Sequence, residues 1–240
     1  MIPEIHAETI ALGPVQLHPF GILLVAGVIA AHTALVRRGR AEALASPRVI
    51  EGFAVALGVG GLLISWGIDR AYGGLGSFPA AAGAILAGAI YGAAFQLDLV
   101  RIADLAAWSF PFGWVFARLG CALVHDHLGP LSTSWLAVRF ASGPRLDLGL
   151  LEWLLVPVLF AAVVVGRRSR RPGAIAGALA IAYPLIRFPL DFLRERDARW
   201  LGLTVAQWGL IPLFLVGAGL LALARIRSDR SAAATSPEEA

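Results

Sequence analysis

The sequence predicts an all-α, polytopic membrane protein with a bundle of about seven transmembrane helices. Of its 240 residues, 58% are hydrophobic and only 15% are charged. The mean hydropathy of +0.75 is too high for an ordinary soluble domain. Apolar runs of about 20 residues recur along the chain, and each is long enough to cross the hydrocarbon core of a bilayer.

Seven apolar segments are expected to span the membrane. They cover residues 19–36, 50–69, 79–97, 103–124, 149–166, 173–192 and 205–225. Several of them are rich in glycine and alanine, which is typical of membrane helices that approach one another closely. We expect residues 1–227 to form a single transmembrane domain. The Ser-, Ala- and Glu-rich residues 228–240 are expected to form a disordered cytoplasmic tail.

The distribution of arginine predicts the orientation of the chain. All 20 basic residues are arginines, and they concentrate after the first span, after the fifth span and after the seventh span. The segment before the first span has no arginine, and the long loop 125–148 has only Arg139 and Arg145. Because cytoplasmic loops carry the excess of positive charge, the N-terminus is expected outside and the C-terminus in the cytoplasm.

The charge pattern and the cysteine count exclude several classes of function. The net charge of +4 lies mostly in loops, so the chain is not expected to bind nucleic acid. The single cysteine, Cys121, excludes an intramolecular disulfide and any metal site with several cysteines. His125 and His127 flank Asp126 in a His-X-His pattern, but with no cysteine pair nearby we expect no metal site. No organic cofactor is expected either.

Arg118 is embedded near the end of the fourth predicted span, among uncharged residues. A central arginine costs roughly 2.5–3.5 kcal/mol on insertion scales, so such residues usually face the interior of a bundle or an aqueous cavity. The alternative is that Arg118 extends to the interface, because it lies about six residues, or roughly 9 Å, from the helix end.

Other ionisable residues are predicted at a similar depth. In the expected orientation, Arg118, Glu152, Arg187 and Asp191 all fall in the outer half of the membrane, on three different helices. Arg187, Asp191 and Arg194 follow at i, i+4 and i+7, so they share one helix face. An ion pair within one helix would explain Asp191 alone. Two intramembrane arginines around one acid favour an anionic ligand such as phosphate, which matches the guanidinium fork.

Several stretches resemble the prolipoprotein diacylglyceryl transferase family of seven-span bacterial enzymes. The family signature has Gly-Arg-Ile/Leu-Gly-Asn-Phe-Ile-Asn-Gly-Glu, followed by a hydrophobic residue, an aromatic residue and glycine. The corresponding run here is Ala117-Arg118-Leu119-Gly120-Cys121-Ala122-Leu123-Val124-His125-Asp126-His127-Leu128-Gly129. The run Arg187-Phe188-Pro189-Leu190-Asp191-Phe192-Leu193-Arg194-Glu195 resembles Arg-Phe-x-x-Glu-Phe-x-Arg-Glu. Two shorter segments, Gly149-Leu150-Leu151-Glu152 and Leu203-Thr204-Val205-Ala206-Gln207, resemble Gln-Leu-Tyr-Glu and Leu-Thr-x-Gly-Gln.

One family motif is altered in this chain. The family carries Ser-Phe-His-Gly-Gly at the start of the third span, with a histidine regarded as important for catalysis. Here the stretch reads Ser77-Phe78-Pro79-Ala80-Ala81, so Pro79 occupies the histidine position. The resemblance therefore indicates a divergent member of the family.

The resemblance implies an enzyme of the bacterial plasma (inner) membrane. It would transfer diacylglycerol from phosphatidylglycerol to the lipobox cysteine in a prolipoprotein signal peptide. Arg118 and Arg187 would bind the phosphate, and Glu152 and Asp191 would orient the arginines or bind glycerol hydroxyls. The matching motifs add further residues to the site: Arg194 and Gln207 for substrate binding, and His125, Asp126 or His127 as substitutes for the missing base. A non-catalytic or altered-substrate paralogue that binds anionic phospholipid or a lipoprotein is the open alternative.

Overall fold

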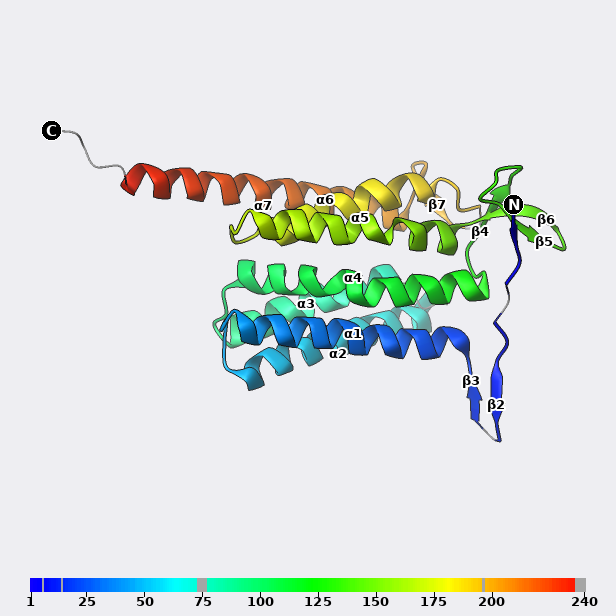
Figure 1. Cartoon of the computed structure of the whole chain (residues 1–240), viewed down its shortest axis with the longest axis horizontal. Helices are drawn as coiled ribbons and strands as arrows, with labels where there is room; N and C mark the ends of the chain where they lie inside the picture. The colour runs from blue at the N-terminus through cyan, green and yellow to red at the C-terminus, as the bar shows by residue number, and fades with distance from the viewer. Residues whose placement is uncertain (6, 14, 73–76, 196, 236–240) are drawn as a thin grey trace.

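The computed structural model shows a bundle of helices that run along a common axis, with short strands gathered at one end (Figure 1). The structure describes residues 1–5, 7–13, 15–72, 77–195 and 197–235. Within these residues the chain forms seven helices. They are α1 (Pro19–Ala41), α2 (Pro47–Tyr72), α3 (Ser77–Ala94), α4 (Leu99–Val124), α5 (Leu148–Arg168), α6 (Ala174–Asp191) and α7 (Val205–Thr235).

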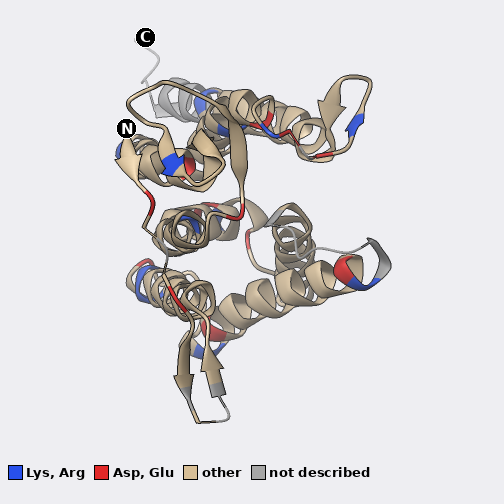
Figure 2. Cartoon of the chain, turned by 90° about the vertical axis from the view of Figure 1, so that its right-hand side faces the viewer, with Lys and Arg blue, Asp and Glu red and all other residues tan. Residues whose placement is uncertain are grey.

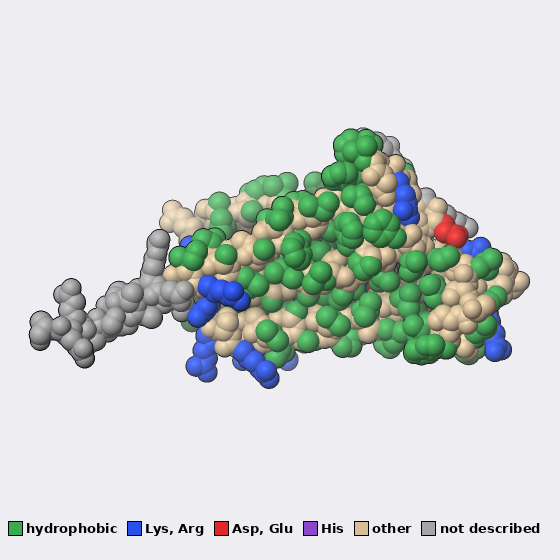
Figure 3. Space-filling model, turned by 90° about the horizontal axis from the view of Figure 1, so that it is seen from above, with side chains coloured by type: hydrophobic (Ala, Val, Ile, Leu, Met, Phe, Trp, Pro, Cys, Tyr) green, Lys and Arg blue, Asp and Glu red, His purple; other side chains and the backbone are tan. Residues whose placement is uncertain are grey.

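The helices confirm a polytopic membrane protein. Six of them are long and apolar enough to cross a membrane, whereas the apolar part of α3 that is described, Phe78–Ala94, is shorter. Large apolar side chains cover the outside of the bundle along its length (Figure 3). Leu62, Ile85 and Val165, for example, are each more than 60% exposed. A surface this apolar matches a hydrocarbon surrounding.

The chain also forms short strands, which correct the expectation of an all-α fold. The largest sheet has the order β1 (Ile2–Pro3), β5 (Val138–Phe140), β6 (Gly143–Asp147), β4 (Leu128–Leu131). Two hairpins join β2 (Ile10–Leu12) to β3 (Val15–Leu17) and β7 (Arg199–Trp200) to β8 (Leu203–Thr204). The first of these hairpins projects away from the bundle (Figure 2). Strands of two to five residues are too short for a hydrophobic alternation to predict them.

The helix order in space brings the predicted site together. Helix α1 packs on α4 and α2 packs on α3, while α5 contacts both α4 and α6, and α6 contacts α7. In Figure 1, α5, α6 and α7 lie above α4, α1 and α2 lie below it, and α3 runs behind it. Helix α7 continues to Thr235, so residues 228–235 of the expected disordered tail belong to this helix. Residues 236–240 lie outside the described part.

Carboxylates anchor several helix starts. Asp98 caps α4, because its Oδ1 accepts from the backbone N–H groups of Val100 and Arg101. Asp147 caps α5 in the same way through Leu150. Asp104, inside α4, accepts from Gly173 and Ala176 at the start of α6, at 2.7 and 2.8 Å. All of these bonds satisfy backbone N–H groups that have no partner within their own helix. Those of Asp104 also fix the start of α6 against α4.

A glycine sets the contact between α4 and α5. Gly149 packs so tightly that an added Cβ would lie 2.9 Å from the backbone nitrogen of Ala122. One turn further along α5 comes Glu152, and one turn before Cys121 on α4 comes Arg118. The close approach at Gly149 therefore brings these two charged side chains within reach of each other.

Candidate functional site

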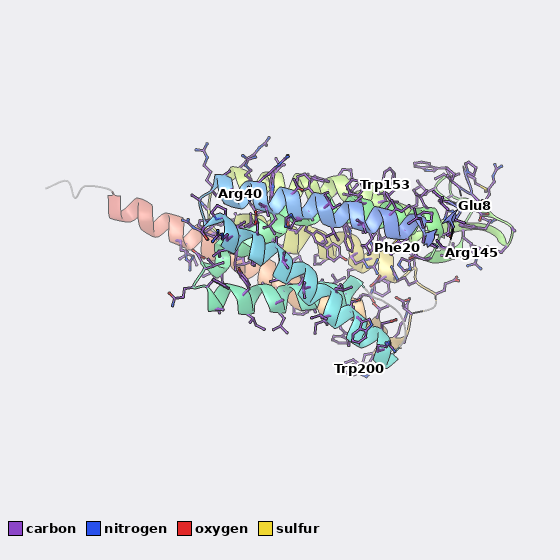
Figure 4. The ribbon with its side chains drawn as sticks, turned by 90° about the horizontal axis from the view of Figure 1, so that it is seen from below. Glu8, Phe20, Arg40, Arg145, Trp153 and Trp200 are labelled. Atoms are coloured by element: carbon purple, nitrogen blue, oxygen red, sulfur yellow. The ribbon has the colours of Figure 1, made fainter. Side chains whose placement is uncertain are left out.

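The centre of the candidate site is the buried carboxylate of Glu152. Its Oε2 lies 2.8 Å from Nε of Arg118, and both side chains are 3% exposed. Its Oε1 forms an ion pair with Nη1 of Arg187 and lies 3.4 Å from Nη2 of Arg194. One carboxylate from α5 thus joins arginines from α4, from α6 and from the turn that follows α6. The adjacent Trp153 lies in the half of the bundle that carries the strands (Figure 4).

Asp191 is the second buried carboxylate of the site. Its Oδ1 lies 2.9 Å from Nη2 of Arg187 and 3.0 Å from Nε of Arg194. Its Oδ2 accepts a hydrogen bond of 3.1 Å from the hydroxyl of Thr204. The expected ion pair within α6 is therefore present, but it is one part of a network that extends over several elements. Arg194 also reaches the partly exposed Asp197 at 3.5 Å.

Gln207 supports this network from α7. Its Oε1 accepts from the backbone N–H of Thr204 at 2.9 Å, and its Nε2 donates to the carbonyl of Phe188 at 2.9 Å. Both ends of the amide are engaged with the main chain, and the side chain is fully buried. In this geometry Gln207 holds the start of α7 against α6, and its expected contact with substrate remains a prediction.

Aromatic rings line the other side of Arg118. The guanidinium carbon lies 4.1 Å from the ring centroid of Trp114, a cation–π contact. Trp114 in turn meets Tyr183 of α6 edge to face, with centroids 5.5 Å apart. The sequence analysis did not single out either ring. Their spacing to Arg118 and Arg187, at i−4 in both helices, is the signal that places them on the same faces.

The three loop residues proposed as bases separate into two groups. Nδ1 of His125 lies 2.5 Å from Oδ2 of Asp147, which also caps α5. This contact ties the end of α4 to the start of α5. Asp126 and His127 instead lie beside Cys121 and face the arginines, with Nε2 of His127 3.7 Å from Asp126.

The electrostatic surroundings of these two residues differ. Burial raises the pKa of the Asp126 carboxyl above its usual value, and the positive charge of Arg118 opposes this shift. Burial and, to a lesser extent, the positive charges of Arg194, Arg118 and Arg187 together lower the pKa of His127 to about 3. His127 is therefore neutral near neutral pH and is a weak proton acceptor.

The segment with Pro79 reaches the same end of the bundle. The ring of Phe78 lies directly against Gly209 of α7, where an added Cβ would be 1.7 Å from the ring. The start of α3 is thereby placed against the first turns of α7, which also carry Gln207. Residues 73–76, the glycine-rich loop before α3, lie outside the described residues.

The comparisons with known proteins agree with this architecture. The family model described as prolipoprotein diacylglyceryl transferase matches residues 7–223. The chain belongs to the prolipoprotein diacylglyceryl transferase family. Three relatives carry the name phosphatidylglycerol–prolipoprotein diacylglyceryl transferase. The protein of Idiomarina loihiensis is 30% identical over 162 residues, which cover 64% of this chain and 61% of the relative.

Two further relatives extend the match to nearly the full length. The transferase of Chromohalobacter salexigens is 29% identical over 93% of this chain and 94% of its own length. That of Geobacter sulfurreducens is 30% identical over 90% of this chain and 94% of its own. The resemblance described above relates Arg118 and Arg187 to the arginines of the family motifs and Pro79 to the histidine position.

Proposed function

We propose that the protein transfers the diacylglyceryl group of phosphatidylglycerol to the thiol of a lipobox cysteine in a prolipoprotein. Membership of the family supports this reaction, and one observation in this chain supports it most directly. Arg118 and Arg187, buried on two helices, share the carboxylate of Glu152. Three guanidinium groups face two buried carboxylates here, and the third acid in reach, Asp197, is exposed. The buried part of the network therefore has one positive charge in excess for a lipid phosphate.

The arginines would act on the negative charge that develops on the phosphate of the leaving group. When sulfur attacks the glycerol carbon, the carbon–oxygen bond breaks and glycerol phosphate leaves with a second negative charge. Guanidinium donors already held in place by Glu152 and Asp191 would stabilise that charge without reorganising. Arg194 joins the same set through both carboxylates. His125, Asp126 and His127 remain the proposed source of the group that generates the thiolate.

The proposed setting is the bacterial plasma (inner) membrane. We infer that all seven helices cross it and that the N-terminus lies outside, because the arginine-rich loops mark the cytoplasmic side. Arg40, in the last turn of α1, lies at the opposite end of the bundle from Arg145 (Figure 4). In this orientation the Glu152 network faces the outer leaflet, where a secreted prolipoprotein presents its lipobox.

A transfer assay tests the function directly. Purified protein is incubated with phosphatidylglycerol and a lipobox peptide, and the peptide mass is measured. The expected result is a peptide heavier by one diacylglyceryl group, together with release of glycerol phosphate. A peptide of unchanged mass, under conditions in which a relative such as the Geobacter sulfurreducens transferase modifies it, would contradict the proposal. The non-catalytic lipid-binding paralogue would then take its place.

A further inference from the structure

Three potential metal ligands converge beside the arginine network, at the end of α4. The thiol sulfur of Cys121, a carboxylate oxygen of Asp126 and a ring nitrogen of His127 all lie within 4.8 Å of one another. No other group of three such ligands occurs in the described part of the chain. Cys121 is buried, whereas Asp126 and His127 are partly exposed, so the cluster opens toward the surface on one side.

The backbone holds these residues in place without a metal. Helix α4 ends at Val124, and His125 adopts a left-handed conformation with φ of 51°, which turns the chain back over the last helical turn. His125 is fixed by its contact with Asp147. The carbonyl of His127 accepts a hydrogen bond of 2.9 Å from Leu148 at the start of α5. The loop that carries two of the ligands is therefore anchored at both ends.

The ligand set fits zinc. Zinc is bound by cysteine sulfur, histidine nitrogen and carboxylate oxygen, and sites with three protein ligands keep a fourth position for water or substrate. We propose that Cys121, Asp126 and His127 bind a zinc ion, and that its fourth position takes the thiol of the acceptor cysteine. The metal site stands on the ligand geometry alone, whereas its role toward the acceptor rests on the proposed function.

The nearby arginines do not prevent cation binding. Two of their three charges face the buried Glu152 and Asp191. The third is opposed by the exposed Asp197 in the free protein and by one lipid phosphate in the proposed complex. The thiolate of Cys121 and the carboxylate of Asp126 balance the two charges of zinc. Nη1 of Arg118 also lies 3.6 Å from the sulfur of Cys121, which suits a hydrogen bond to a metal-bound thiolate.

The role of the metal follows from thiol chemistry. A thiol that coordinates a divalent cation loses its proton, and the thiolate is the nucleophile. Zinc-bound hydroxide leaves as water with the proton of the acceptor thiol, and the acceptor sulfur takes its place. That sulfur then forms a bond to the glycerol carbon of phosphatidylglycerol. The carbon–oxygen bond breaks, and its electron pair leaves on glycerol phosphate beside Arg118 and Arg187.

The proposed zinc site would replace the proton acceptor that Pro79 cannot provide. The resemblance to the family assigns importance to a histidine at that position, and proline has no group that accepts a proton. By the same correspondence, Cys121 stands where the signature has asparagine, and His127 stands where it has a hydrophobic residue. Two of the three ligands thus occur at positions where this chain departs from the signature.

Cobalt titration of the purified, full-length protein tests the site. Cobalt(II) replaces zinc and gives a thiolate-to-metal charge-transfer band when a cysteine is bound. Cys121 is the only cysteine of the chain, so such a band must come from it. The protein is prepared without a histidine tag. We expect one cobalt per chain, and displacement of cobalt by one equivalent of zinc.

Variants identify the ligands. Cys121→Ser should abolish the band, and His127→Gln should weaken cobalt binding by more than the about 10–100-fold typical for loss of an outer-shell partner. His32→Gln, at an exposed position on α1, is the matched control and should bind as wild type does. A lipobox peptide with cysteine, but not with serine, should intensify the band.

The outcomes separate this inference from the proposed function. Absence of the band in the wild-type protein, or its persistence in Cys121→Ser, would overturn the metal site. A band that the cysteine peptide leaves unchanged would overturn the role toward the acceptor. If metal-free Cys121→Ser transfers diacylglycerol at the wild-type rate, the role of the metal in the reaction falls and the transferase assignment stands. If metal binds and nothing is transferred, the metal site stands and the transferase assignment falls.

Discussion

Arg118 of α4 and Glu152 of α5 form a buried ion pair, with 2.8 Å between Nε and Oε2. The pair connects two helices, and Glu152 extends it to a third through Arg187. Breaking a buried ion pair by removing one partner is strongly destabilising, because it leaves an uncompensated charge. The effect of each substitution therefore depends on which partners the remaining charge retains.

Arg118→Ala should abolish most of the transfer while the protein stays folded. Glu152 keeps Arg187 and Arg194 as partners, so the loss of stability should stay below the about 3–5 kcal/mol of a fully orphaned buried charge. Loss of one donor to developing charge typically costs about 10²–10³-fold in rate. Arg118→Lys should recover only part of the rate, because an ammonium cannot form a bidentate contact.

The control for this prediction is Arg139→Ala, which removes an exposed arginine of the same half of the molecule. Its transfer rate, measured by the mass of the lipobox peptide, should match wild type. A wild-type rate in Arg118→Ala would exclude the proposed contact with the phosphate.

Glu152→Gln should reduce stability more than Arg118→Ala does. The substitution takes the shared carboxylate from three arginines and leaves Asp191 as their buried acid. An anionic ligand can replace the lost charge, so phosphatidylglycerol should raise the unfolding temperature of Glu152→Gln more than that of wild type. Unfolding is followed by intrinsic fluorescence in a detergent without charged groups.

Glu51→Gln provides the comparison for the loss of a carboxylate. Glu51 pairs with Arg40, but both side chains are about half exposed, so the pair should contribute little. Equal stabilisation of Glu152→Gln and wild type by the lipid would show that the lipid does not bind at the arginines.

The positions of all seven helices were predictable from the sequence, because long apolar runs have one stable arrangement in a membrane. Each predicted span falls within a helix or overlaps nearly all of one. The grouping of Arg118, Glu152, Arg187 and Asp191 was also predictable, since the expected directions of their helices place them at one depth. The contacts of Thr204, the last residue of β8, depend on tertiary geometry that no spacing rule describes.

The arrangement around residue 125 was least predictable from the sequence. His125, Asp126 and His127 were expected only as candidate bases in one loop, and Cys121 served only to exclude a disulfide and a metal site with several cysteines. The reversal at His125 changes this, because it places Asp126 and His127 over the last turn of α4. A left-handed conformation at a residue other than glycine is uncommon, so a spacing argument does not anticipate it.

Thr204→Val should lower the transfer rate by releasing Asp191. The hydroxyl of Thr204 donates to Oδ2 of Asp191 and accepts from the backbone N–H of Gln207, and valine has the same shape without either bond. A buried acceptor that loses its donor costs about 1–3 kcal/mol, and Asp191 would then orient Arg187 and Arg194 less well. We expect kcat to fall about tenfold, in line with 1.4 kcal/mol per factor of ten, with little change in KM for the peptide.

Thr204→Ser is the matched variant, since it keeps the hydroxyl and removes only a methyl group. It should retain a rate near that of wild type. If Thr204→Ser loses as much activity as Thr204→Val, packing of the methyl group is the cause, and the hydrogen bond has no role in the reaction.

The orientation of the chain can be tested with reporter fusions. Reporters inserted within residues 37–48 and 167–171 should be active in the cytoplasm, because these loops hold dense arginine clusters. A reporter within residues 125–148 should be active outside. The opposite location of the last reporter would place the Glu152 network at the inner leaflet and would contradict the proposed access of a secreted lipobox.

Gly149→Ala tests whether the spacing of α4 and α5 sets the site. Alanine normally stabilises a helix by about 1 kcal/mol relative to glycine. At position 149, however, the new Cβ would lie 2.9 Å from backbone atoms of Cys121 and Ala122, which cannot yield as a flexible side chain can. The helices must separate, so Glu152 moves away from Arg118. We expect lower thermal stability, slower transfer and weaker cobalt binding in the same variant.

Gly58→Ala on α2 is the control, because an added Cβ there meets no atom within 4 Å. It should leave stability unchanged or raise it, in keeping with helix propensity, and it should transfer diacylglycerol at the wild-type rate. If the two substitutions change the stability in opposite directions, the loss in Gly149→Ala comes from the steric contact and not from a general effect of alanine. If Gly149→Ala is as stable and as active as Gly58→Ala, the α4–α5 contact is not what positions Glu152 against Arg118.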